Sequence, residues 1–241
     1  MIRMGKNLIQ QARGKGSPTY RAPSFRYRAD AKHIPVQKEP VSGEIIDIVT
    51  CQGHSAPLAQ IKYENGMTCY TIAPEGIRVG DKVVIGQESP IAPGNTASLK
   101  NIPDGTLIYN IESNPGDGGK FCRAGGAFAR VLTHIKGKVL VLLPSKKQRL
   151  FSEECRASIG IVAGSGRKEK PFMKAGKKHH YMKARNKLYP IVSGAAMNAV
   201  DHPFGTSRSL RKSKARPAPK NAPPGRKVGM IRPKRSGRKK K

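Results

Sequence analysis

The chain has 241 residues and carries 46 lysines and arginines against 15 aspartates and glutamates, a formal net charge of +31. This balance is typical of a protein that neutralises nucleic-acid phosphates, and it disfavours a free compact globule because like charges repel. A spanning helix needs an apolar run of about 18 residues, and a secretory signal needs an apolar core near its start. The sequence shows neither.

Residues 1–36 are expected to form a basic N-terminal arm. Aromatic side chains alternate here with arginines: Tyr20, Arg21, Phe25, Arg26, Tyr27 and Arg28. Such a mixture stacks on bases and binds phosphates at the same time. The expected RNA contacts of the arm are Tyr20, Arg21, Phe25, Arg26 and Arg28. An ordinary basic tail with incidental aromatic residues is the alternative.

Residues 37–113 are expected to form a small closed barrel of the oligonucleotide-binding type. Residues 39–115 hold 4 basic and 9 acidic side chains, so the positive charge lies elsewhere. Segments rich in β-branched and aromatic residues predict strands at 43–51, 57–63, 67–74, 81–86 and 106–113, with a hairpin turn at Asn65-Gly66. Five short strands in this length favour a barrel, although the pattern alone equally allows a sandwich.

Residues 114–195 are expected to form an SH3-like barrel that carries a basic segment from about residue 165. The predicted strands are 127–135, 138–145, 148–154 and 157–164. A glycine-rich connector at 114–127 lacks the Lys-Ser/Thr of a P-loop, so we expect a tight crossover or a close backbone approach to a partner. The predicted fold class is mainly β: two small barrels with long basic irregular N- and C-terminal extensions.

The pattern of strands ends near residue 165, and one short helix is expected around 173–186. Residues 196–241 are expected to form a basic C-terminal extension, because they contain many prolines and no periodic apolar face. Both segments supply expected RNA contacts: Lys177, Lys178, His179, Lys183, Arg185, Arg208, Arg211, Lys212, Lys214, Arg216, Lys220, Arg226 and Lys227.

Asp201 and His202 raise two hypotheses. The pair resembles an acid–base couple, but adjacent residues on an extended chain point to opposite sides, and no nucleophile or metal partner stands at a useful spacing. We therefore expect no catalytic residue. In the RNA-contact hypothesis, Gly194 lets the sugar-phosphate backbone approach, Asn198 reads a base edge, Asp201 accepts from a base amine or a 2′-hydroxyl, and His202 donates to a phosphate. A structural turn is the alternative role for Asp201.

The cysteines do not predict a metal centre. Cys51, Cys69, Cys122 and Cys155 stand at wide, uneven spacings without a CxxC pair. This pattern indicates free thiols in a reducing compartment, and a zinc site is the weaker alternative. No metal site and no cofactor are expected, and Mg²⁺ held by bound RNA, rather than by the protein, stays open.

Residues 190–205, PIVSGAAMNAVDHPFG, closely resemble the signature of the ribosomal protein L-two family of the large subunit. Three further segments resemble archaeal-type members of this family. The N-terminal arm of those members is similar to residues 14–28, the start of their second barrel to residues 114–132, and their tail to residues 221–231. Three features depart from the family pattern: Ser193 replaces an arginine, Ala199 replaces a proline, and residues 204–207 replace a longer glycine-rich run.

The resemblance implies an oligonucleotide-binding barrel followed by an SH3-like barrel, in a primary binder of the large ribosomal RNA. Such a protein supports subunit association and the architecture of the peptidyl transferase region. Its implied partners are that RNA, neighbouring ribosomal proteins and the small subunit, in a cytoplasmic ribosome, without a membrane or a homo-oligomer. In the family the histidine that matches His202 is important for ribosome activity, and we assign His202 a structural role. The alternative functions are a general nucleic-acid compacting protein and an RNA-processing enzyme that uses Asp201 and His202.

Overall fold

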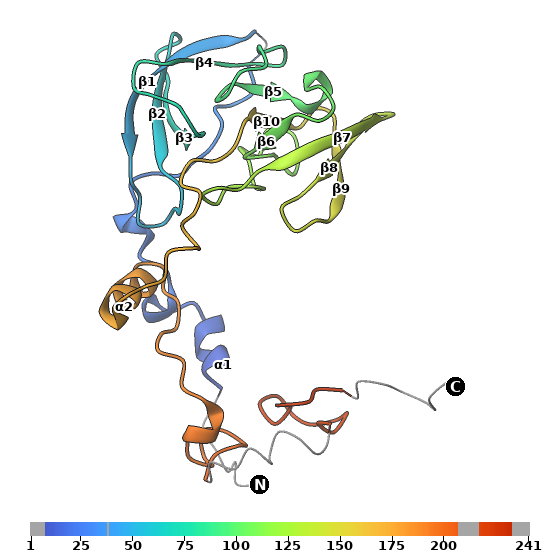
Figure 1. Cartoon of the computed structure of the whole chain (residues 1–241). Coiled ribbons are helices and arrows are strands. Elements are labelled where there is room, and N and C mark those ends of the chain that lie inside the picture. Colours follow the sequence, from blue (N-terminus) through green and yellow to red (C-terminus); the bar gives the residue numbers. More distant parts are fainter. Residues whose placement is uncertain (1–7, 38, 207–216, 233–241) are drawn as a thin grey trace. The chain divides into compact units, whose positions relative to one another are not determined.

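The computed structural model describes residues 8–37, 39–206 and 217–232 (Figure 1). The chain divides into two compact units. One unit combines Met1–Ala22 with Asn186–Lys241, and the other is Pro23–Arg185. All ten strands of the described residues belong to the second unit and form one sheet, so the expectation of a mainly β protein is confirmed.

The first four strands lie where the sequence predicts them: β1 Val41–Val49, β2 Leu58–Tyr63, β3 Thr68–Ile72 and β4 Lys82–Ile85. β1 is central and pairs antiparallel with both β2 and β4, and β2 pairs with β3 across the expected turn. Gly66 in that turn has a φ of +80°, which an L side chain rarely adopts. A bulge in β1 between Ile45 and Asp47 leaves the apolar Ile46 on the exposed side.

The remaining six strands are β5 Thr96–Ser98, β6 Leu107–Tyr109, β7 Ala129–Ile135, β8 Lys138–Leu142, β9 Gln148–Ser152 and β10 Arg156–Ile159. β7, β8 and β9 form an antiparallel meander, and β10 lies between β5 and β6. The sequence pattern missed β5, because three residues are too few to show an alternation.

The strand order in the sheet is β3-β2-β1-β4-β5-β10-β6-β7-β8-β9, and the sheet is not closed. The parallel pair of Ile85 with Thr96 joins β4 to β5, and an isolated antiparallel bridge between Pro74 and Val162 also connects the two halves. The expectation of two small closed barrels is therefore not confirmed. Closure depends on pairing between strands that are distant in sequence, and the local pattern that reveals each strand carries no information about its partner.

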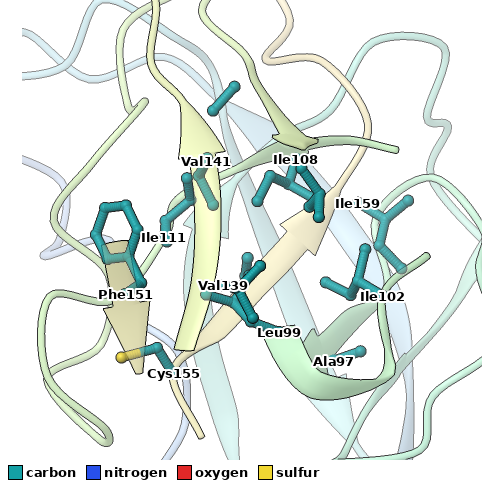
Figure 2. Close-up of a cluster of buried hydrophobic side chains, with 13 residues drawn as sticks. Ala97, Leu99, Ile102, Ile108, Ile111, Val139, Val141, Phe151, Cys155 and Ile159 are labelled. Carbon is teal, nitrogen blue, oxygen red and sulfur yellow. The ribbon is translucent and has the colours of Figure 1, made fainter. Parts of the chain in front are cut away.

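Two main clusters of buried side chains stabilise the halves. The first packs Ile45, Ile61, Val83 and Ile85 of the early strands together with Ile34 of the N-terminal arm. The second, drawn in Figure 2, lies under the later strands and consists of Ala97, Leu99, Ile102, Ile108, Ile111, Ala129, Val131, Val139, Val141, Phe151, Cys155, Ala157 and Ile159. Residues before position 113 thus share one core with residues well after it.

The helices are short and bury no side chains. α2, Ala175–Ala184, lies within the expected interval 173–186, whereas α1, Ile9–Gly14, was not expected. Single 3-10 turns occur at Pro18–Tyr20, Ser24–Arg26, Leu99–Asn101 and Gly194–Ala196. Across the described parts of the chain, no helix combines the length and the apolar character that crossing a membrane requires.

Candidate nucleic-acid interface

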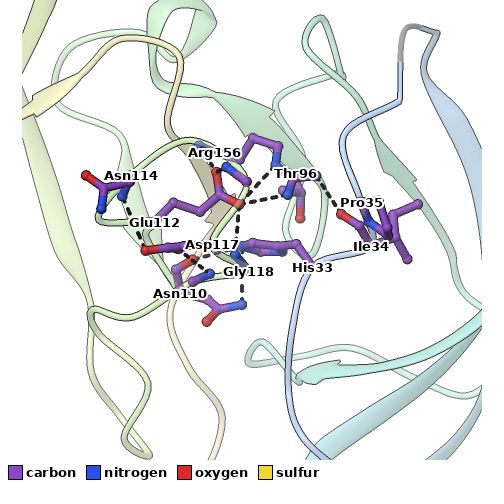
Figure 3. A network of polar contacts seen from close by, with 12 residues as sticks. His33, Ile34, Pro35, Thr96, Asn110, Glu112, Asn114, Asp117, Gly118 and Arg156 are labelled. Carbon is purple, nitrogen blue, oxygen red and sulfur yellow. Dashed lines mark hydrogen bonds and ion pairs between the residues drawn. The ribbon is translucent and has the colours of Figure 1, made fainter.

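The arm is anchored to the sheet by its last residues. Ala31, His33 and Ile34 are buried, and the N–H of His33 donates to the carbonyl of Gly118 at 3.1 Å. The Arg156 guanidinium donates through Nη1 to the carbonyl of Ile34 at 2.8 Å (Figure 3). The backbone of residues 33 and 34 is therefore fixed to the sheet, and the aromatic and basic residues at 25–28 lie directly before this fixed point.

A buried ion pair organises this anchor. Arg156 and Glu112 are almost completely buried, and Nη2 of Arg156 lies 2.7 Å from Oε1 of Glu112. The same carboxylate accepts hydrogen bonds from the N–H groups of Gly116 and Gly118 in the connector. Burial alone would raise the pKa of Glu112, but the hydrogen bonds and the charge of Arg156 hold that pKa below its ordinary value. The glycine-rich connector, which joins the paired antiparallel strands β6 and β7, folds around this carboxylate.

His33 lies beside the ion pair and stays neutral. Its Nε2 lies 2.9 Å from the carbonyl oxygen of Asn110, to which it donates in the neutral form. Burial lowers the pKa of His33 to about 4, because a charged imidazolium in this site loses its water. Asn110 itself has a φ of +47°, and its side-chain amide approaches Gly119 too closely for any residue with a Cβ at that position.

Phe25 and Tyr27, two of the aromatic residues of the arm, have different surroundings in the structure. The Phe25 side chain is 82% exposed, and the Arg26 guanidinium lies 5.4 Å from the centre of its ring. Tyr27 instead packs over Gly53, and its hydroxyl donates to the carbonyl of Ala184 at 3.0 Å. Phe25 is thus accessible to a base, whereas Tyr27 packs against the protein itself.

Helix α2 presents its cations to solvent. Lys177, His179 and Lys183 are exposed, and no residue of the helix is buried. Arg185 at its C-terminal end differs from them, because its guanidinium lies 3.9 Å from the centre of the Tyr181 ring and donates to the carbonyl of His54 at 3.2 Å. Arg185 therefore ties the end of α2 to the sheet unit as well as adding charge.

The segment around Asp201 and His202 forms a compact turn in the other unit. The N–H groups of Asp201 and His202 both donate to the carbonyl of Asn198, at 3.0 Å and 3.1 Å. The imidazole ring lies directly against Gly194, where any Cβ would overlap it. Gly205, the buried end of the turn, lies so close to the Asn198 backbone that it has no room for a side chain either.

The His202 ring is oriented by the chain that follows it. The N–H of Phe204 donates to Nδ1 of His202 at 3.0 Å, so the hydrogen of the neutral ring lies on Nε2. The rings of His202 and Phe204 pack with their centres 5.1 Å apart. This arrangement suits a hydrogen-bond donor more than a general base, because a backbone group already occupies one of the two ring nitrogens.

The 217–232 segment packs against the same turn. Gly229 contacts the tip of the Phe204 ring, and Gly225 contacts Leu8. Lys220 and Lys227 are linked, since Nζ of Lys227 donates to the carbonyl of Lys220 at 3.1 Å. Three segments that are far apart in sequence thus meet within one unit.

The expected contacts therefore fall into two groups. Phe25, Arg26 and Arg28 belong to the sheet unit together with α2, whereas Tyr20 and Arg21 belong to the unit that contains the 193–206 turn. Arg208, Arg211, Lys212, Lys214 and Arg216 lie outside the described residues.

Sequence reasoning missed the residues that shape the turn unit, above all Leu8, Phe204 and Gly225. The pair Pro223-Pro224 followed by a glycine was the available signal, because it predicts a tight turn.

The four cysteines are free thiols, and within residues 8–37, 39–206 and 217–232 no three histidine, cysteine or acidic side chains gather as a metal site would require.

Comparison with known proteins gives matches over nearly the whole chain. The family model described as "Ribosomal Proteins L2, RNA binding N-terminal domain" matches residues 9–85, and the model described as "Ribosomal Proteins L2, C-terminal domain" matches residues 92–223.

Individual proteins also match this chain over nearly its full length. The chain is 50% identical over 236 residues to "Large ribosomal subunit protein uL2" of Natronomonas pharaonis, covering 98% of this chain and 97% of the relative. Proteins of the same name from Archaeoglobus fulgidus and Haloarcula marismortui are 51% and 49% identical, and these alignments cover 97% and 98% of this chain and 99% and 98% of the relatives.

Proposed function

The chain belongs to the ribosomal protein L-two family, and from this membership we propose how it serves the large ribosomal subunit. It is an RNA-binding structural protein of that subunit and not an enzyme. The full-length similarity to relatives named for the large subunit is the observation that carries this conclusion. The further proposals concern how its residues bind the RNA and what that binding supports.

The sheet unit acts as a rigid support, and the cations around it hold the RNA. Phe25, Arg26 and Arg28, the lysines of α2, and the cations at 220–227 contact phosphates and unpaired bases. Each phosphate contact releases condensed counterions, and this release offsets the roughly 1–2 kcal/mol of backbone entropy lost for each residue that RNA orders. The exposure of Phe25, Lys177 and Lys183 supports this role.

The second group of contacts lies at the turn around His202. Asn198 and Asp201 recognise base edges or sugar hydroxyls, and His202 donates through Nε2 to a phosphate. The hydrogen bond from the Phe204 N–H to Nδ1 of His202 supports this assignment. Because Nδ1 accepts this bond, the neutral ring carries its hydrogen on Nε2, which can donate to the RNA. Arg208, Arg211, Lys212, Lys214 and Arg216 continue the same basic stretch, and we assign them phosphate contacts by their charge alone.

The two halves of the sheet correspond to the two small barrels of the family. The cluster beneath β1–β4 and the cluster beneath β5–β10 support this division, and a third cluster, which includes Leu58, Ile72, Tyr109 and Val162, packs the two halves together. We place the boundary between residues 86 and 95, rather than at 113–114, because Ala97 and Ile108 pack with the later strands. Residues 1–36 remain the arm, and the segments from about 165 and from 196 remain basic extensions.

In the assembled ribosome, which is cytoplasmic, the protein is a primary binder of large-subunit RNA. It supports association with the small subunit and the architecture of the peptidyl transferase region, beside neighbouring ribosomal proteins and without forming a homo-oligomer. A bound Mg²⁺ would belong to the RNA.

A competition experiment tests the proposed function against the alternative of a general nucleic-acid compacting protein. Labelled folded large-subunit RNA competes with unlabelled duplex DNA, and with the same RNA unfolded by chelation of Mg²⁺, at physiological salt. We expect the folded RNA to bind about 10³-fold more tightly than the DNA, the usual order of a specific over a non-specific nucleic-acid complex. Equal affinity for all three would support the compacting protein instead.

A further inference from the structure

We propose that a cleft in the unit containing His202 binds one unpaired base of the RNA. This cleft, called here the proline cleft, opens between the 199–203 loop and the 223–226 loop, has a volume of about 510 Å³, and includes Pro203, Pro223, Pro224, Val200, His202 and Arg226 in its lining. The inference rests on the proposed RNA binding and adds to it a site for a particular chemical group.

Much of the wall of the proline cleft is apolar. Pro203 lies on one loop and Pro223 and Pro224 lie on the other, and Val200 adds aliphatic surface. The faces of a nucleobase favour such contacts, whatever the base, since every base presents a π-face. The volume falls within the range of roughly 300–1,000 Å³ that is usual for small-ligand pockets, so an extruded base and part of its sugar have enough room.

Each wall is held by the hydrogen bonds of its own loop. On one side, the backbone N–H groups of Asp201 and His202 donate to the carbonyl of Asn198. On the other, the N–H of Arg226 donates to the carbonyl of Pro223 at 3.1 Å, and Gly225 has a φ of +87°. Leu8 packs against Gly225, where a Cβ would lie 2.6 Å from its Cδ2. These hydrogen bonds and the Leu8 contact shape the two walls of the cleft.

The polar groups of the proline cleft favour an RNA ligand over an apolar peptide. The Phe204 N–H bond leaves the neutral His202 ring with its hydrogen on Nε2, and Arg226 contributes a guanidinium. Both are donors, and they suit the carbonyl and ring-nitrogen acceptors of a base and the oxygens of its phosphate. Asp201 also lines the cleft, and its carboxylate can accept from a base amine or a 2′-hydroxyl. Lys220 and Lys227 add positive charge in the same segment, which would attract a polyanion.

Filling the cleft distinguishes the base from the phosphates. Ala199→Leu places a larger side chain at an exposed lining position, and Ala218→Leu adds the same volume in the same unit outside the cleft. The affinity of the full chain for folded large-subunit RNA is measured across a series of salt concentrations. We expect Ala199→Leu to weaken binding about ten-fold, which is within the usual effect of losing one stacked base. The slope of log affinity against log salt should stay the same, because no cation is lost.

Two further variants complete the experiment. Val200→Ala removes apolar wall surface without adding bulk and should also weaken binding at an unchanged slope. Lys227→Gln should lower the slope by about one, as expected for the loss of one phosphate contact. Chemical probing of the bases should reveal one nucleotide that the wild-type protein protects and that Ala199→Leu leaves reactive.

The outcomes separate the inference from the proposed function. If Ala199→Leu and Val200→Ala bind and protect the RNA like the wild type, the proline cleft holds no base, while RNA binding itself stands. If the wild-type protein does not prefer the folded RNA, the proposed function fails first. A loss of affinity in Ala218→Leu equal to that in Ala199→Leu would also overturn the inference.

Discussion

Gly194 and His202 show why a single residue matters in this protein. They are eight positions apart, yet the turn brings the imidazole ring against the glycine with no room for a Cβ. The small residue therefore serves the protein's own packing, in addition to letting RNA come close. The orientation of His202, with Nδ1 bonded to the Phe204 N–H, depends on this contact.

Replacing Gly194 by alanine should displace His202. Steric overlap of this kind typically costs about 1–3 kcal/mol, which is enough to open an exposed turn. We expect Gly194→Ala to weaken binding to folded large-subunit RNA several-fold and to shift the NMR signals of the His202 ring. Unfolding of the sheet unit should not change. Gly176→Ala in α2 is the matched control, because nothing lies within 4 Å of its added Cβ, and it should bind RNA like the wild type.

At the scale of the element, α2 has the character of a charged rod more than that of a packing helix. It buries no side chain, and its C-terminal end is held by Arg185 and by the Tyr27 hydroxyl, which donates to the carbonyl of Ala184. An exposed helix of ten residues gains little stability from packing, so its cations serve another purpose. Phosphate binding is the purpose that its composition supports.

Removing two cations from α2 should alter RNA binding without altering the fold. We expect Lys177→Gln together with Lys183→Gln to lower the slope of log affinity against log salt by about two, one for each phosphate released. The free energy of unfolding should stay within about 0.5 kcal/mol of the wild type, since both side chains are exposed. Lys62→Gln in β2 removes an exposed cation from the acidic part of the chain and should leave the slope unchanged. An equal effect of Lys62→Gln would contradict an RNA-binding role specific to α2.

At the scale of the whole molecule, each acidic side chain offsets part of a net charge of +31, and the chain has only 15 of them. Glu112 is fully buried against Arg156, and this pair links the arm, the glycine-rich connector and β10. A fall in pH can protonate two groups of this network: the Glu112 carboxylate and His33, which is buried beside it in its neutral form. Protonation of either group adds to the positive charge and breaks the anchor of the arm.

The sheet unit, Pro23–Arg185, should lose stability as the pH falls. The folded pKa of His33 is about 4, below its unfolded value of 6.5, so the unfolded chain binds the extra proton between these values. Stability from this residue is complete above about 6.5 and declines toward pH 4, by up to about 3 kcal/mol. Glu112, whose folded pKa is also depressed, adds a loss below its unfolded value of 4.5.

Denaturant unfolding at a series of pH values measures this loss, with the fluorescence of the buried Tyr63 and Tyr109 as the signal. We expect His33→Gln to flatten the pH dependence between 6.5 and 4, whatever its effect on absolute stability. His179→Gln, an exposed histidine on α2, should leave that dependence as in the wild type. A wild-type protein whose stability does not change from pH 6.5 to pH 4 would contradict the buried neutral state of His33.

Much of this protein is determined by its sequence alone. The excess of cations, the family motif around Asp201-His202, nine of the ten strands and α2 are all visible in local patterns. Such patterns suffice because alternation, turn residues and charge act between neighbours along the chain. Local patterns did not predict the three-residue β5 or the six-residue α1, because neither is long enough to show a periodic alternation of apolar and polar residues.

Only the tertiary structure decided how these parts combine. It joined Ala97 and Ile108 to the later core, left the sheet open, and separated the exposed Phe25 from the packed Tyr27. It also brought Leu8 to Gly225, from opposite ends of the chain, and so formed the proline cleft. The physical reason is common to all four: burial and pairing are contacts between residues distant in sequence, and these contacts exist only once the chain has folded.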